Sequence, residues 1–254
     1  MVRSYYDQFG EAIANFGCGY VLKLKPHLPD LGRHEISEDE AFLCWAFYLG
    51  MLSMESMLAV VALTRVNAVH MAFALTRPLY EYLTKLEYYA RHKSEAKRSY
   101  ASIASRMLFH GNHYGNLAPE IIEAMRPHHE AWTDYEPQAS FKSMFKFRQA
   151  TEELYPQRAT RLMTEFYEMP GDFLHAANTK LHDIIGRENL ATTAYSPNKT
   201  VSDACIHFLC ILSLLRDEFP EVYGDDPHLD SAVMDYVELA GDHCLWRTEP
   251  EGFD

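Results

Sequence analysis

Residues 57–92, MLAVVALTRVNAVHMAFALTRPLYEYLTKLEYYARH, form a strongly apolar stretch with a helical pattern that nevertheless contains ionisable side chains. Four of these lie among apolar residues, where a buried helix normally has no charged side chain: Arg65, His70, Arg77 and Glu81. Arg77 and Glu81 are four residues apart, so on a helix they share one face and can pair. Pro78 lies between them, where a straight helix would avoid proline. The pattern predicts helix, interrupted near Asn67 and ending near His92, with a polar cluster in apolar surroundings.

Helical patterns extend through the rest of the chain, and no segment shows sustained strand-like alternation. Residues 3–24 have the spacing of an amphipathic helix, with apolar side chains three to four positions apart. Ser37 and Glu40 have the spacing of a capping box, which opens a helix running towards Thr64. This helix is apolar around most of its circumference, which predicts a central position. Further helices are expected at 94–109, 119–125, 141–154, 157–169, 173–185, 204–219 and 229–241.

These patterns predict an all-α protein, a single helical domain over residues 1–254 with roughly seven to ten helices packed as a bundle. The core is expected at about 37–219. Residues 187–200 are polar and contain Pro197, so they are expected to form an exposed connection. Residues 247–254 are expected to form a loose tail.

Composition limits the function classes. The formal net charge of −13 favours solubility and disfavours non-specific attraction to nucleic acid phosphates. The N-terminus lacks the apolar segment of a signal peptide, and the five cysteines show no metal-ligand or disulfide-rich spacing. We therefore expect a cytoplasmic protein with reduced thiols.

One segment, residues 41–64, is long and apolar enough to span a membrane. Glu55 falls near its centre, however, and a charge there is costly in lipid. We therefore expect a buried bundle helix and no membrane partner. The 16 tyrosines and 14 phenylalanines leave enough apolar surface for a homodimer.

His175 is the expected third member of the cluster of Arg77 and Glu81. It is followed by Asn178 and, seven positions later, by His182, which shares its helix face. A histidine beside an arginine and a glutamate is typical of general acid–base catalysis near neutral pH. The alternative is a buried ion-pair network that only holds helices in register. The residues leave the choice between these two roles open.

Metal and cofactor sites are not expected. Asp172 and His175 have the spacing of one half of a di-iron bundle motif, but the chain has no Glu-x-x-His, and Asp203 and His207 are four apart rather than three. Glycine-rich phosphate loops and nucleophile elbows are also missing from the sequence.

Two resemblances add to this interpretation. Arg77-Pro78-Leu79-Tyr80-Glu81 after an apolar helix, with the later Phe173-Leu174-His175, resembles a bacterial all-helical family of unknown function over residues 40–215. The signature of that family is Arg-(Ser/Pro)-Leu-x-Glu, followed by a tyrosine or serine turn and an inward histidine. This chain has Pro170-Gly171-Asp172 where a serine is expected. The resemblance implies a polar centre formed by Arg77, Glu81 and His175 inside a bundle, and it supplies no reaction.

Arg65 and His70, with four residues between them, are similar to the ribonuclease motif of HEPN proteins. That superfamily consists of small helical bundles that cut RNA without metal, usually as dimers. The most concrete hypothesis is therefore a bacterial HEPN-like, metal-independent ribonuclease or stress and defence effector. It would act on RNA or on a small phosphate-bearing ligand. The competing hypothesis is a non-enzymatic binding or scaffold protein.

Overall fold

The computed structural model describes residues 5–30, 36–101 and 196–240, together with residues 119, 120, 122, 123 and 126. All regular elements in these ranges are helical, which confirms the all-α prediction. Seven α-helices have assigned bounds there: α1 Tyr5–Leu22, α2 Glu38–Arg65, α3 Val69–Ala74, α4 Thr76–Arg91, α11 Pro197–Glu218, α12 Pro220–Tyr223 and α13 Pro227–Ala240. Residues 93–101 are also helical, and Lys25–His27 form a short 3-10 helix. The helices expected between 127 and 195 and the tail 247–254 lie outside the described residues.

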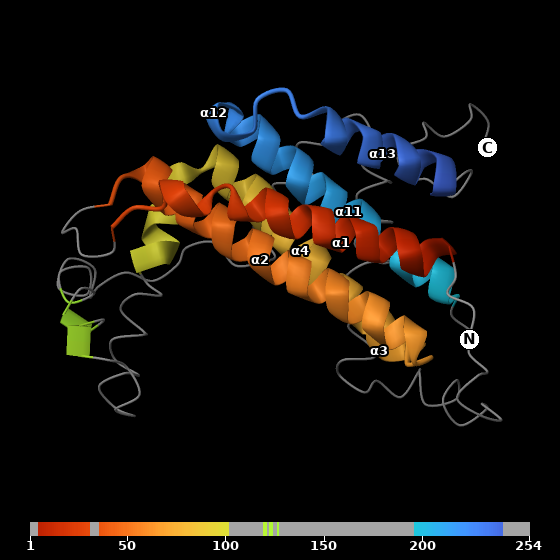
Figure 1. The fold of residues 1–254 in the computed structure, drawn as a ribbon. Coiled ribbons are helices and arrows are strands. Elements are labelled where there is room, and N and C mark those ends of the chain that lie inside the picture. Colours follow the sequence, from red (N-terminus) through yellow and green to blue (C-terminus); the bar gives the residue numbers. More distant parts are fainter. Residues whose placement is uncertain are drawn as a thin grey trace, which may run out of the picture.

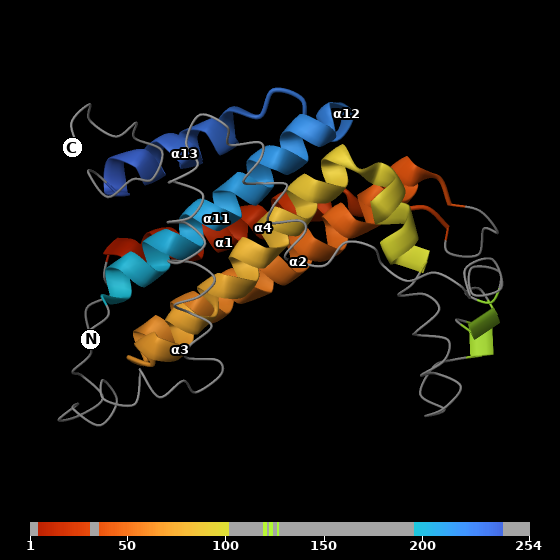
Figure 2. The ribbon, with the colours of Figure 1, turned by 180° about the vertical axis from the view of Figure 1, so that it is seen from behind.

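Four long helices, α1, α2, α4 and α11, pack around a common core (Figure 1). α11 touches α1, α2 and α4, and on its other side it carries α12 and α13. The view from behind confirms that α13 is separated from α2 and α4 by α11 (Figure 2). The core is continuous across these helices because each buries apolar side chains against the others, with Phe42, Leu79, Phe208 and Leu212 all at most 1% exposed.

Local sequence signals determine where α2 begins and ends. Ser37 Oγ accepts the Glu40 N–H at 3.1 Å, and Glu40 Oε2 accepts the Ser37 N–H at 2.8 Å, so the predicted capping box is present. After α2 ends, Asn67 has a φ of 61°, in the left-handed region that asparagine tolerates better than most residues. This turn confirms the break expected near Asn67.

The opening stretch is divided once more, at Leu75, because of Pro78. Proline has no N–H, so Pro78 cannot donate to the carbonyl of Ala74, four residues earlier, and a continuous helix would lose that bond. α3 therefore ends at Ala74, and α4 begins at Thr76, which places Pro78 in its first turn. The Thr76 hydroxyl donates to the Phe73 carbonyl at 2.7 Å.

α1 lies unusually close to its neighbours at two glycines, Gly10 and Gly17. A Cβ added to Gly17 would lie 2.3 Å from the Phe208 ring of α11, and one added to Gly10 would lie 2.8 Å from Val201. The two glycines are seven residues apart and so lie on one face of α1. The absence of side chains at these two positions permits the close α1–α11 contact.

The start of α11 corrects one prediction. Residues 197–200, expected in an exposed connection, form its first turn, and the helix begins seven residues before the expected Ala204. The proline at 197 suits a first helical position, because its fixed φ is already helical and its missing N–H would have had no helical partner. Ser196 is the N-cap and accepts the Lys199 N–H at 3.4 Å.

Two of the described helices, α2 and α11, are long and apolar enough to cross a membrane by length and composition alone. Core helices of soluble proteins pass the same test, so this finding is weak evidence in either direction.

Candidate functional site

Arg77 and Glu81 form the ion pair that their spacing predicted. Arg77 Nε donates to Glu81 Oε1 at 2.7 Å, and both residues belong to α4. Their side chains are 16% and 35% exposed, so the pair is half-buried rather than enclosed in the core as expected. Arg77 also takes part in at least one further interaction.

Lys85 extends this pair by one more helical turn. Burial lowers the pKa of Lys85, and the nearby charge of Glu81 partly opposes that shift. The Lys85 ammonium lies 5.0 Å from the centroid of the Trp45 ring, within the range of a cation–π contact. Arg77, Glu81 and Lys85 are each four residues apart on α4, and we call them the α4 charged stripe.

Next to the stripe, Tyr82 of α4 lies close to Ser56 of α2. Burial raises the pKa of Tyr82, the nearby Ser56 partly offsets this shift, and the charges of Glu81 and Glu55 raise the pKa further. Because Glu81 is paired with Arg77 and lies near Lys85, the edge between α2 and α4 carries charges of both signs.

A second polar cluster lies between α4 and α11, and we call it the α4–α11 seam. It comprises Thr76, Tyr80 and Thr84 of α4, each at most 1% exposed, and Asp203 and His207 of α11, at 7% and 4%. The rings of Tyr80 and His207 are in contact, with centroids 5.6 Å apart and planes tilted by 48°. Tyr80, Thr84, Asp203 and His207 each take part in at least one further interaction.

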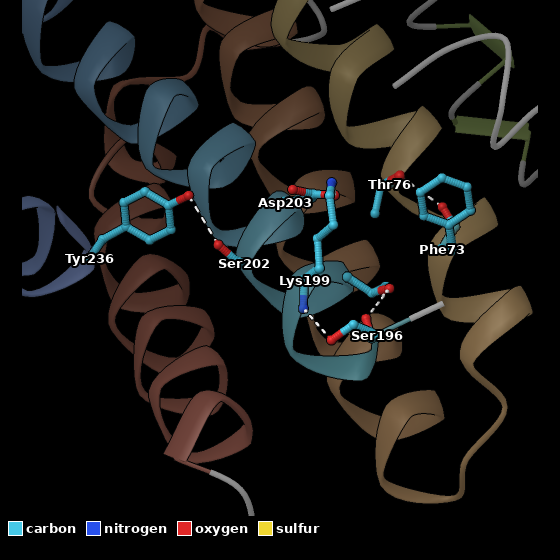
Figure 3. A network of polar contacts seen from close by, with 8 residues as sticks. Phe73, Thr76, Ser196, Lys199, Ser202, Asp203 and Tyr236 are labelled. Carbon is cyan, nitrogen blue, oxygen red and sulfur yellow. Dashed lines mark hydrogen bonds and ion pairs between the residues drawn. The ribbon is translucent and has the colours of Figure 1, made fainter. Parts of the chain in front are cut away.

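Asp203 accepts a hydrogen bond from Lys199 Nζ at 2.6 Å, within α11. Figure 3 shows Lys199 and Asp203 on the side of α11 nearer Thr76, whereas Ser202 points the other way, towards Tyr236 of α13. The Ser202 and Tyr236 hydroxyls are 3.2 Å apart. α11 therefore presents polar side chains to α4 and α13 on two different sides.

The seam was not among the sites predicted from the sequence, where the four-residue spacing of Asp203 and His207 counted only against a metal motif. Arg77 and Glu81 have the same spacing, and Asp203 and His207 also lie in a helix rich in buried apolar residues. Within the described residues, no group of three or more His, Cys, Asp and Glu side chains is placed to hold a metal ion.

The residues of the HEPN-like motif lie on different helices. Arg65, at the end of α2, donates from Nη2 to Glu11 Oε2 of α1 at 2.6 Å. His70 lies beyond the Asn67 turn, on α3, and is 7% exposed. Arg65 thus joins α1 to α2, a contact that the spacing in the sequence did not indicate.

His175, the expected third member of the cluster, and the weaker candidates Asn178 and His182 lie outside the described residues. Comparison with protein-family models, curated proteins and solved structures gave no match.

Proposed function

We propose that the α4 charged stripe binds the phosphate of a ligand, with Arg77 as the anion contact and Glu81 as the group that orients it. In its most specific form, the proposal is a metal-independent, HEPN-like ribonuclease or defence effector in which His175 transfers the proton. The ligand chemistry is a phosphate ester, supplied either by RNA or by a small molecule.

The observation that carries the proposal is that Arg77 and Glu81 pair within one helix. A pair inside α4 cannot hold two helices in register by itself. Among the described residues, ion pairs that join separate elements include Arg65 with Glu11, Lys23 with Asp226, Lys93 with Asp39 and Arg216 with Asp230. Even when exposed, a pair four residues apart on a helix contributes about 0.3–0.5 kcal/mol, and here the Arg77 side chain is also largely withdrawn from water, at 16% exposed, which adds a desolvation cost.

The chemistry suits the residue types. The planar guanidinium of arginine matches phosphate oxygens in a two-pronged contact, and a carboxylate at Nε fixes its orientation. In RNA cleavage without metal, the 2′-hydroxyl attacks phosphorus and gives its proton to a base such as histidine. The 5′-oxygen leaves and takes up a proton, which gives a cyclic phosphate and a 5′-hydroxyl.

The net charge favours a small ligand over a long RNA. A charge of −13 repels polyanions at long range, whereas one or two phosphates are repelled far less. The two sources are separated by two assays with the full chain: calorimetric binding of 5′-AMP, and cleavage of a labelled single-stranded RNA in EDTA.

The test compares Arg77→Ala with Arg98→Ala. Arg98 is a matched control because it also pairs within a helix, with Glu95 at 3.2 Å, and its side chain is 40% exposed. We expect Arg77→Ala to weaken 5′-AMP binding at least tenfold and to abolish any RNA cleavage, with a melting temperature within about 2 °C of the wild type. Arg98→Ala should change neither. His175→Ala should abolish cleavage and leave binding largely intact.

Two results would contradict the proposal. One is a wild-type protein that neither binds 5′-AMP nor cleaves RNA. The other is an Arg77→Ala protein that melts many degrees lower while its binding is unchanged, which would assign the pair a structural role.

A further inference from the structure

The side of α2 that faces solvent is apolar. Among the described residues, six large hydrophobic side chains are exposed: Tyr48 at 52% and Leu58 at 40% lie on α2, Val66 at 69% directly follows it, and Met71 at 52% lies on α3; the other two are Leu22 and Met234. α2 packs against α1, α3, α4 and α11 with its other faces. The sequence predicted a central position for α2 from its apolar circumference; within the described part of the chain, α2 has four packing partners and one face that no other element covers.

The exposed residues follow a regular spacing. Tyr48, Met51, Glu55, Leu58 and Ala62 are separated alternately by three and four positions, and none of them is buried. Leu52, Ala59 and Val66, beside them, are not buried either. These eight residues are called the outer α2 strip. An alternating spacing of three and four is the pattern that packs against another helix in a coiled coil.

The strip is long enough for such a partner. From Tyr48 to Val66 it covers 18 residue steps, or about 27 Å at 1.5 Å per residue. A surface helix of a soluble protein normally turns polar side chains outwards. A contiguous exposed apolar face usually marks an interaction site.

Charge distinguishes between the possible occupants. Glu55 is the only charged member of the strip and lies near its middle, fully in the exposed class. At the neighbouring α4 edge, Glu81 is paired with Arg77 and lies one turn from Lys85, so the charge that distinguishes the occupants is that of Glu55. A lipid surface is a poor occupant, because it would surround the Glu55 carboxylate with apolar chains. A second copy packed symmetrically on this face would bring Glu55 against Glu55, because Glu55 lies near the middle of the strip.

We propose that the outer α2 strip docks one amphipathic helix of another protein, with apolar heptad positions along the strip and a Lys or Arg opposite Glu55. A single charged residue in such a seam fixes the register of the two helices, because any other alignment leaves its charge unpaired. The proposal is independent of the phosphate site on α4.

The test uses two synthetic 21-residue helical peptides with Leu and Ile at the heptad positions, one with a central Lys and one with a central Glu. Fluorescence anisotropy measures their binding to the full chain. We expect the Lys peptide to bind at least tenfold more tightly than the Glu peptide, and we expect Glu55→Lys to reverse the preference. Leu58→Asp should abolish binding of the Lys peptide. Met234→Asp should not, because Met234 is 65% exposed on α13, away from the strip.

The proposal would be overturned if neither peptide binds or if both bind equally well. It would also be overturned if Met234→Asp weakens binding of the Lys peptide as much as Leu58→Asp does. Sedimentation provides a further check. A wild-type dimer that Leu58→Asp converts to monomer would assign the strip to a second copy of this chain. The wild-type protein could also float with vesicles of phosphatidylcholine and phosphatidylserine. If it does and Leu58→Asp abolishes this flotation, the outer α2 strip binds a membrane.

Discussion

Replacing Gly17 by alanine is expected to destabilise the protein, although alanine is the better helix former. Gly17 lies in the interior of α1, where an exposed Gly→Ala change normally gains about 0.5–1 kcal/mol. The new methyl group, however, would lie 2.3 Å from two ring carbons of Phe208, whereas ordinary carbon contacts are 3.4 Å or longer. Phe208 is completely buried, so its ring has no solvent-filled space to move into.

The magnitude follows from these opposing terms. An overpacked core methyl costs about 1–3 kcal/mol, and a displacement of more than 1 Å of a buried ring belongs at the upper end of that range. Subtracting the helix gain leaves a net loss of about 2 kcal/mol. For a chain of this size, that corresponds to a fall in melting temperature of about 4–8 °C.

Gly19→Ala is the matched control. Gly19 belongs to the same helix, but a Cβ at this position would meet nothing within 4 Å. The control should therefore gain about 0.5–1 kcal/mol and melt slightly higher. Thermal melts and urea titrations of the two variants measure the difference directly. If both variants melt higher than the wild type, the close α1–α11 contact at Phe208 is wrong. A Phe208→Leu background should reduce the cost of Gly17→Ala, because the smaller side chain leaves room for the methyl group.

Two further predictions concern titration. Burial and the nearby Glu40 raise the pKa of the Cys44 thiol to about 11, so Cys44 should react slowly with iodoacetamide at pH 7.5 and faster as the pH approaches 10.5. Peptide mapping by mass spectrometry measures this rate, and rapid labelling at pH 7 would contradict it. Burial opposes ionisation of Asp226, but hydrogen bonds from Lys23 and the His228 N–H outweigh it and lower the pKa of Asp226. Its contribution to stability should be complete above the ordinary carboxyl pKa of about 4 and should be lost as the pH falls below that value. The difference in unfolding free energy between the wild type and Asp226→Asn should therefore be constant from pH 5 to 7 and shrink below pH 4; a constant difference down to pH 2 would refute it.

The parts of the fold that the sequence predicted are those with local causes. The capping box of Ser37 and Glu40, the turn at Asn67 and the interruption near Pro78 each depend on a few adjacent residues. The pairing of Arg77 with Glu81 is local in the same sense, because helical spacing alone brings the two together. The start of α11 also had a local signal, in Ser196 and Pro197, but the polar composition of the preceding residues outweighed it in the prediction.

The parts that the sequence did not predict depend on contacts between distant segments. The seam between α4 and α11 joins Tyr80 to His207, and periodicity identifies the buried face of each helix without identifying its partner. The same limit applies to the outer α2 strip. An apolar circumference indicates that a helix is covered on all sides, but it does not reveal that part of the cover is absent from the described residues.

The seam and the stripe also show why polar groups on one helix can have different roles. Tyr80 and His207 meet across two helices, so a change in either alters how α4 and α11 fit together. Arg77 and Glu81 are neighbours of Tyr80 on the same helix, yet their bond joins no second element. The polar groups of the seam are almost completely buried, and leaving one such group without a partner costs about 1–3 kcal/mol. A half-buried pair within one helix avoids most of that cost. The α4–α11 seam is therefore where stability should respond to substitution, and the α4 charged stripe is where binding should respond.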